Sequence, residues 1–170
     1  LEHAINDKTK LIFLTNPNNP TGRMMPEAEL RAIANMADRV GAWLLVDEVY
    51  AGLEWAGPRA PSIAGLYPRG ITTGSVSKAL GLQGLRTGWL ICPDAMLVQD
   101  AVILRENASE IMNILGETIA EIALRPARLT AALSSARQTA LETLGRLDTY
   151  IAKEPGLSWH SPQAGLIGLA

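Results

Sequence analysis

Short apolar runs separated by turn residues make up the first half of the chain, and this pattern predicts four β-strands. The runs are residues 11–15, 43–47, 71–75 and 88–92. Apolar residues at helical spacing from Leu30 to Val40 predict a helix between the first two strands, with Pro26 at its first position. Residues 51–70 predict a loop with one short helical piece. Because apolar strands that flank a helix favour a parallel sheet covered on both faces, the pattern predicts an α/β fold.

The second half of the chain has a different pattern, which predicts helices. Residues 94–152 contain almost no glycine or proline, and we expect two or three helices there. The last helix is predicted from about residue 127 to 153, with its apolar positions on one face. The sequence Glu-Pro-Gly at 154–156 ends it, and residues 157–170 predict the first strand of a further subdomain.

Composition and charge exclude several classes of protein. The chain has 170 residues, of which 48% are hydrophobic and 19% charged, as in a globular domain. The net charge of −2 and the lack of a basic run argue against nucleic-acid binding, and no apolar stretch predicts a membrane span. A single cysteine, Cys92, rules out an intrachain disulfide and fits the cytoplasm. The chain starts at Leu1 and stops inside an apolar run, so we expect it to be cut from a longer protein.

Polar side chains follow three of the predicted strands, at the point where each strand ends. They are Asn16, Asn18 and Asn19 after the first strand, Asp47 and Tyr50 after the second, and Ser75, Ser77 and Lys78 after the third. Ligands of open α/β sheets bind at the carboxyl ends of the strands. Three polar clusters at one sheet edge therefore predict a binding site.

The stretch 74–86 adds a more specific indication. It places hydroxyls, the amine of Lys78 and the guanidinium of Arg86 in a run that contains Gly81 and Gly84. Such a set suits a ligand that carries both a phosphate and an electrophilic carbon. Each residue alone also has a structural interpretation, as a turn, a helix cap, a core-edge tyrosine or a solvated cation. Together, in this order and at these strand ends, they favour the site.

Three motifs resemble the class I/II aminotransferases, which are pyridoxal-phosphate (PLP) enzymes of fold type I. They are NPNNPTG at 16–22, DEVY at 47–50 and SVSKALGLQGLRTGW at 75–89, and SPQAGL at 161–166 is compatible. The resemblance implies a three-layer α/β/α large domain with a mostly parallel sheet, of which this chain holds a part. It divides the chain into residues 1–126 of the PLP-binding large domain, a connecting helix at 127–153, and the start of a truncated small C-terminal domain at 154–170.

The resemblance also implies two chemical roles. Lys78 would form a Schiff base with the PLP aldehyde and, once substrate displaces it, would move the proton between the substrate and the cofactor. Asp47 would pair with the protonated pyridine nitrogen, so that the ring can take up electrons from the substrate.

The remaining predicted contacts hold the cofactor in place. Tyr50 and Asn19 would donate hydrogen bonds to its phenolic oxygen. Arg86 would bind the phosphate bidentately, with help from the hydroxyls of Ser75 and Ser77. No metal site is expected, because the histidines lack partners at ligand spacing.

The implied function is amino-group transfer between an amino acid and a 2-oxo acid. A PLP-dependent β-lyase, racemase or decarboxylase, a non-catalytic PLP-binding regulator domain and a degenerate structural copy are the alternatives. Family members also have an upstream phosphate-binding turn, an aromatic residue stacked on the ring, and a carboxylate-binding arginine in the C-terminal domain, which residues 1–170 do not supply. Family sites also borrow residues across a dimer interface. The resemblance thus implies a homodimer at full length, and we expect this chain to be inactive alone.

Overall fold

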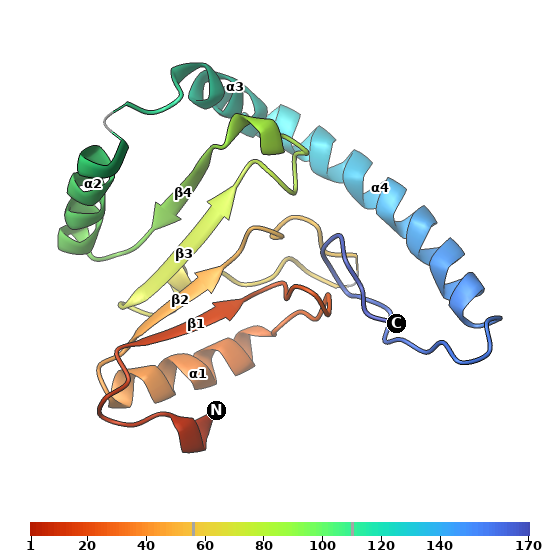
Figure 1. The fold of residues 1–170 in the computed structure, drawn as a ribbon, viewed down its shortest axis with the longest axis horizontal. Helices are drawn as coiled ribbons and strands as arrows, with labels where there is room; N and C mark the ends of the chain where they lie inside the picture. Colours follow the sequence, from red (N-terminus) through yellow and green to blue (C-terminus); the bar gives the residue numbers. More distant parts are fainter. Residues whose placement is uncertain (56, 110) are drawn as a thin grey trace.

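The centre of the molecule is a four-stranded sheet in the order β1-β2-β3-β4 (Figure 1). The structure is a computed structural model that describes every residue except Ala56 and Glu110. The strands are β1 (Leu11–Thr15), β2 (Trp43–Asp47), β3 (Gly70–Ser75) and β4 (Gly88–Ile91). The first three are parallel, and β4 runs antiparallel to β3. The four predicted strands and the mostly parallel α/β sheet are confirmed.

The parallel strands end level with one another. Thr15 pairs with Asp47, and Asp47 pairs with Thr73. The ladder continues one residue further, because the Asn16 amide donates to the Asp47 carbonyl and the Glu48 amide to the Thr73 carbonyl. This register brings the carboxyl ends of three strands to a single edge of the sheet, as the predicted site requires.

Helix α1 (Glu27–Arg39) covers one face of the sheet. Its residues Leu30 and Ala37 are fully buried in the same cluster as Leu44 and Val46 of β2. Pro26 lies just before the helix, with an extended ψ of 160°. The prediction that it is the first residue of the helix is therefore wrong. Burial of branched apolar side chains between a helix and a sheet supplies the main driving force for this layer.

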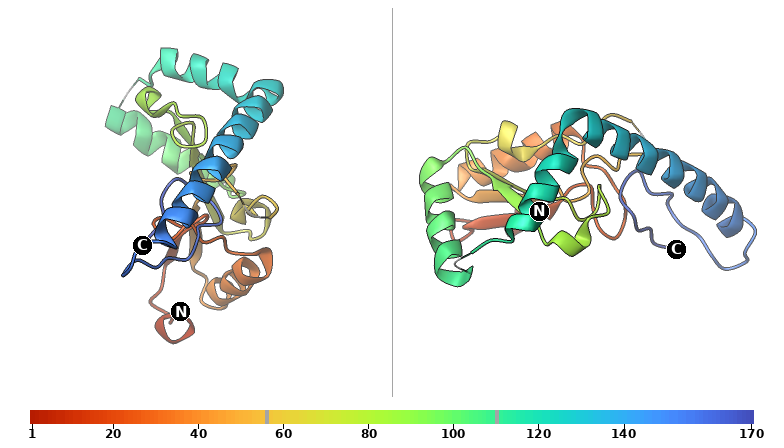
Figure 2. Two further views of the ribbon diagram at one scale, coloured as in Figure 1. Left: turned by 90° about the vertical axis from the view of Figure 1, so that its right-hand side faces the viewer. Right: turned by 90° about the horizontal axis from the view of Figure 1, so that it is seen from above.

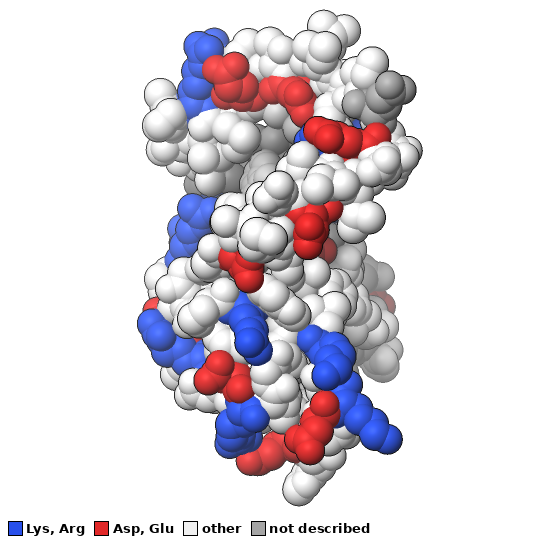
Figure 3. Space-filling model, turned by 90° about the vertical axis from the view of Figure 1, so that its left-hand side faces the viewer, with Lys and Arg blue, Asp and Glu red and all other residues white. Residues whose placement is uncertain are grey.

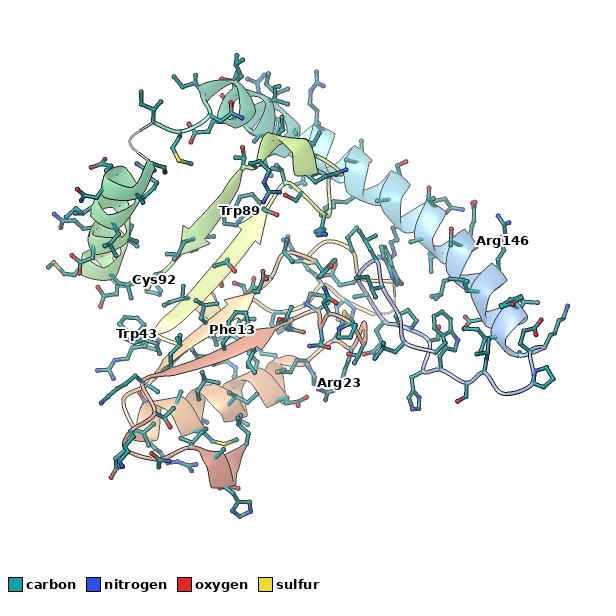
Figure 4. The ribbon with its side chains drawn as sticks, viewed as in Figure 1. Phe13, Arg23, Trp43, Trp89, Cys92 and Arg146 are labelled. Carbon is teal, nitrogen blue, oxygen red and sulfur yellow. The ribbon has the colours of Figure 1, made fainter. Side chains whose placement is uncertain are left out.

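The other face of the sheet is open in this chain. Leu11 and Phe13 of β1 are 51% and 61% exposed, because alternate strand residues point away from α1. Figure 4 labels Phe13 on β1 and Trp43 at the start of β2. The sequence predicted cover on both faces of the sheet. Within the described residues, α1 covers one face only. The later helices lie beyond the ends of the strands and do not cross the sheet (Figures 1 and 2).

In the part of the chain that the structure describes, three α-helices follow the sheet, in line with the two or three expected. They are α2 (Ala95–Ser109), α3 (Ile114–Leu124) and the long α4 (Pro126–Ile151), and the shorter 3-10 helices are η1 (Glu2–Ala4), η2 (Ile63–Gly65) and η3 (Gln83–Leu85). The apolar face of α4 packs through Ala136, Ala140 and Leu144 on a buried cluster that contains Tyr50 and Trp55. Among the described residues, no helix has the length and apolar character needed to cross a membrane.

The remaining predictions for loops and domains have different outcomes. The short helical piece expected in the loop 51–70 is η2. Two residues of predicted segments lie outside the described residues: Ala56 of this loop and Glu110 of the helical stretch. The division of the chain into domains stays a prediction.

The strand predicted for residues 157–170 is wrong. That segment forms only an isolated bridge between Ala164 and Glu54. Pro162 has no amide proton to donate, and Gly165 has a φ of +88°, which strands do not use. Instead, the backbone of residues 163–165 bonds to two loops near the strand ends.

We expect Leu44→Ala to lower the free energy of unfolding by about 2–5 kcal/mol, because it opens a cavity in a fully buried layer. Urea denaturation measures the change. Leu104→Ala on α2, where the side chain is 71% exposed, serves as the matched control and should change stability by less than about 0.5 kcal/mol. Equal losses from the two substitutions would contradict the assignment of the core.

Candidate functional site

All seven residues predicted to contact the cofactor line one cavity at the carboxyl ends of β1, β2 and β3. Asn16 and Asn18, which the sequence also placed at this edge, do not line it; the side chain of Asn16 is buried and bonds to the Met25 backbone. The cavity has a volume of about 610 Å³. Its walls include Asn19, Asp47, Tyr50, Ser75, Ser77, Lys78 and Arg86, together with Thr15 and Val49. Segments that lie up to 71 positions apart in the sequence, from Thr15 to Arg86, thus meet around one space.

The carboxylate of Asp47 is held firmly at the end of β2. Its Oδ1 accepts hydrogen bonds from the Val49 amide at 3.1 Å and from the Thr73 hydroxyl at 3.2 Å. Among the described residues, both hydrogen bonds to this carboxylate go to Oδ1. The side chain is therefore oriented by the protein, and Oδ2 is available to a cationic donor in the cavity.

Tyr50 and Asn19 come from different loops and meet through their side chains. The Asn19 amide nitrogen donates to the Tyr50 hydroxyl over 3.2 Å. Tyr50 is only 3% exposed, so its ring position is determined by packing. Because Asn19 donates to the phenol oxygen, the phenol proton can itself be donated to a ligand in the cavity.

The loop from Ser75 to Arg86 supplies the hydroxyl and cationic groups. The Ser77 amide donates to the Ser75 hydroxyl at 3.2 Å, and Gly81 takes a φ of +67°, which allows the chain to bend back. Arg86 has a left-handed φ of 53°, and its guanidinium donates to the Gln83 carbonyl at 3.1 Å. A non-glycine residue in this conformation is uncommon and is often found at functional sites.

Basic side chains outnumber acidic ones in the lining of the cavity. The cavity is lined by two basic side chains, Lys78 and Arg86, and one carboxylate, Asp47. On the face shown in Figure 3, acidic and basic side chains are interspersed. The donor set suits a compact ligand with an anionic group at one end and a protonated nitrogen at the other.

Glu48 lies behind the site, on the opposite face of the sheet from Asp47. Its Oε1 accepts hydrogen bonds from the Ile63 amide and from the Thr72 hydroxyl, both at 3.0 Å. Burial raises the pKa of Glu48 above its ordinary value of 4.5, and the hydrogen bonds from Ile63 and Thr72 partly oppose that shift. Adjacent threonines of β3 thus anchor the two adjacent acids of the DEVY motif, one on each face.

Sequence reasoning missed three residues that line or order the cavity: Thr15, Val49 and Thr73. Thr15 and Thr73 are in register with Asp47 and share its face of the sheet. The level ends of the predicted strands contained this signal. The hydroxyls of Thr15 and Thr73 did not stand out, because threonine is common in strands for reasons of packing alone.

Comparison with known proteins places these features in a family. The family described as "Aminotransferase class I and II" matches residues 1–169. Histidinol-phosphate aminotransferase 2 of Hydrogenovibrio crunogenus is 30% identical over 98% of this chain and 43% of its own length.

Solved structures have the same fold. A PLP-dependent aminotransferase of Streptococcus suis superposes with a TM-score of 0.88 and 31% identity, over 95% of this chain and 42% of that one. A PLP-bound C-S lyase of Staphylococcus hominis gives a TM-score of 0.78 and 25% identity, over 91% and 39% of the two chains. The chain therefore spans less than half the length of these relatives.

We expect Glu48→Gln to become more stabilising, relative to the unchanged protein, as the pH rises from about 4.5 to 7. A raised pKa in the folded state means that stability from the protonated acid is present at low pH and is lost as the pH rises through the folded pKa. The glutamine keeps an acceptor for Ile63 and Thr72 but does not ionise. Urea unfolding at a series of pH values measures the difference.

The exposed Glu154→Gln provides the control for this series, since its side chain is solvated. Its difference from the unchanged protein should not grow over the same range. If the Glu48→Gln difference stayed constant with pH, the buried-acid assignment would be wrong.

Proposed function

Because this chain belongs to the aminotransferase class I and II family, we propose that it supplies the lysine-bearing part of a PLP-dependent aminotransferase, which moves an amino group between an amino acid and a 2-oxo acid. The convergence of Lys78, Asp47, Tyr50 and Arg86 on one cavity carries this proposal. An isolated lysine or aspartate would not support it. An amine, a carboxylate, a phenol and a guanidinium around one space match the functional groups of PLP.

The residues present fit this cofactor, on the chemistry of their donor and acceptor groups. The free Oδ2 of Asp47 would hold the protonated pyridine nitrogen, and the bonded Tyr50 and Asn19 pair would donate to the phenolic oxygen. The phosphate would be bound by the guanidinium of Arg86 and the hydroxyls of Ser75 and Ser77. Lys78 would hold the aldehyde carbon covalently through Nζ.

When bound, PLP supplies a cationic ring that takes up the electron pair left at the substrate α-carbon. Asp47 maintains the charge on that ring, because a hydrogen bond to a charged partner contributes about 1.5–3 kcal/mol. Once substrate has displaced it from the aldehyde carbon, the free Lys78 Nζ would accept the proton from the substrate α-carbon and deliver it to the former aldehyde carbon of the cofactor. The lysine is exposed and joined to the sheet by a loop that contains glycine, so its amine has the freedom to move a proton between two positions.

A lyase on the same scaffold is the second candidate, and the likeness to the C-S lyase structure supports it. A β-lyase, racemase or decarboxylase would use the same residues to hold the cofactor. The reactions differ in which substrate bond is cleaved and in which group takes the proton. A non-catalytic PLP-binding regulator domain would need the cofactor groups but no proton transfer by Lys78.

The wider setting of the enzyme is part of the same proposal. We expect the full-length protein to act as a homodimer in the cytoplasm on small amino and 2-oxo acids. The relatives are more than twice as long as this chain, and this supports our expectation that the chain is inactive alone.

In the full-length protein, Lys78→Ala should abolish covalent attachment of PLP and lower turnover by about 10²–10⁴-fold, the usual effect of removing a general base. Borohydride reduction followed by peptide mass analysis reports the attachment. The exposed Lys153→Ala is the matched control and should keep both attachment and turnover. Retention of the PLP adduct in Lys78→Ala would assign the covalent link to another residue.

A single half-reaction separates the two candidate activities. We expect the PLP-loaded full-length protein, mixed with an amino acid and no 2-oxo acid, to convert its cofactor stoichiometrically to pyridoxamine phosphate and release the matching 2-oxo acid. Absorbance and chromatography of the released cofactor follow the conversion. Continuous release of ammonia or a thiol, with the cofactor unchanged, would identify a lyase instead.

A further inference from the structure

The segment Ser161–Gly165, here called the strap, runs between the two loops that carry Asn19 and Tyr50. We call residues 16–25 the asparagine loop and residues 50–55 the tyrosine loop. The strap follows α4 and returns to the carboxyl ends of β1 and β2 (Figure 1). It lies outside the wall of the cofactor cavity, so none of the roles proposed above involves it.

The strap bonds to the asparagine loop at three points. The amides of Gln163 and Ala164 both donate to the Gly22 carbonyl, at 2.9 and 3.0 Å. The Met24 amide in turn donates to the side-chain oxygen of Gln163 at 2.9 Å. Gln163 therefore holds this loop with its backbone and its side chain together.

The same residues bond to the tyrosine loop on the other side. The Trp55 amide donates to the Gln163 carbonyl at 2.7 Å, and the Gly165 amide donates to the Leu53 carbonyl at 2.9 Å. Ala164 is fully buried between the loops and forms the bridge to Glu54. Gln163 is thus bonded to both loops through three different groups.

Close packing makes the contact specific. A Cβ atom on Gly22 would overlap the Cβ of Pro162, and Gly22 has a φ of +64°, so only glycine suits this position. Gly165, with a φ of +88°, lies against the ring of Tyr50, to which an added Cβ would come within 3.8 Å. The strap therefore packs on the phenol that is proposed to contact the cofactor.

We propose that Gln163 is a positioning residue, which sets the relative placement of Asn19 and Tyr50 by tying their loops together. This inference rests on the proposed function, because the phenolic oxygen of PLP is the group that these two donors serve. The Asn19–Tyr50 hydrogen bond joins one residue of each loop over 3.2 Å. A shift of either loop changes that distance and moves both donors relative to the phenolic oxygen.

The side-chain bond of Gln163 can be removed without unfolding the protein. Gln163 is exposed, and the Met24 amide can bond to water when the glutamine oxygen is gone. The backbone bonds of the strap remain in place. Loss of the side-chain oxygen should therefore loosen the asparagine loop while the fold persists.

Misplaced donors have a defined effect on bound PLP. Hydrogen bonds donated to an anionic oxygen lower its attraction for a neighbouring proton, here the proton on the lysine-linked nitrogen. When Asn19 and Tyr50 are displaced, that proton is held more tightly. The pH midpoint of the visible absorbance change of bound PLP then moves to higher pH.

The test compares four versions of the full-length protein: unchanged, Gln163→Met, Gln163→Glu and Gln138→Met. Methionine removes the acceptor at nearly constant length, whereas glutamate keeps an acceptor oxygen for Met24. Gln138 bonds to Glu142 on the exposed side of α4, so Gln138→Met is the matched control for the same substitution elsewhere. Two measurements are made: a pH titration of the visible absorbance of bound PLP, and amide hydrogen exchange without PLP.

For Gln163→Met we expect the absorbance midpoint to rise by about half a pH unit or more. Complete loss of one hydrogen bond to a charged oxygen corresponds to roughly one to two units. Exchange in the asparagine loop should be faster by roughly two- to tenfold, the range that corresponds to one ordinary hydrogen bond. Gln163→Glu and Gln138→Met should match the unchanged protein in both measurements.

An unchanged midpoint of the PLP absorbance in Gln163→Met overturns the inference, whether or not amide exchange in the asparagine loop is faster. A contact that only stabilises the loop would alter the exchange and leave the midpoint unchanged. A midpoint shift of equal size in Gln138→Met overturns it as well. If the unchanged protein shows no PLP absorbance, the proposed function fails instead. The exchange experiment then still decides whether the Gln163 side chain holds the loop, because it does not require the cofactor.

Discussion

The level register of β1, β2 and β3 is the constraint on which the rest of the structure depends. Thr15, Asp47 and Thr73 pair side by side, so the three chain segments that follow them leave the sheet at one edge. A slip of one residue would turn every side chain of a strand to the opposite face. It would exchange Asp47 with Glu48 and expose Leu44 and Val46. Burial of those two residues under α1 therefore also maintains the orientation of the site carboxylate.

The site at this edge combines two side chains that the protein holds in place with two cationic side chains on an exposed loop. Asp47 and Tyr50 are held in position by hydrogen bonds and packing within the protein. Lys78 and Arg86 stand on an exposed loop. A preorganised carboxylate and phenol cost little reorganisation when they contact a charged ring. An exposed amine on a loop, in contrast, is suited to carry a proton between two atoms, so the division of the site matches its proposed chemistry.

Contacts between distant parts of the chain complete this arrangement. Gln163 lies 139 positions after Met24, yet their bond ties the strap to the asparagine loop. The helix α4 places the strap there, since it extends from α3 to a turn beyond the tyrosine loop and packs on that loop through Ala140 and Leu144. In this way the residues that follow the sheet help to order the loops at its edge, although none of the described ones lines the cavity.

The sequence by itself determined the elements and the chemistry. Periodicity of apolar residues predicted the four strands, α1 and α4, and the polar residues at strand ends indicated one site with the amine of Lys78 and the acid of Asp47, because both signals are local. Only the tertiary structure decided that residues 161–165 form a strap and not a strand, and that Thr73 orients Asp47. It also decided that Phe13 faces outward in this chain. These outcomes depend on which partners a backbone group or a side chain meets across the fold, and a linear pattern does not contain that information.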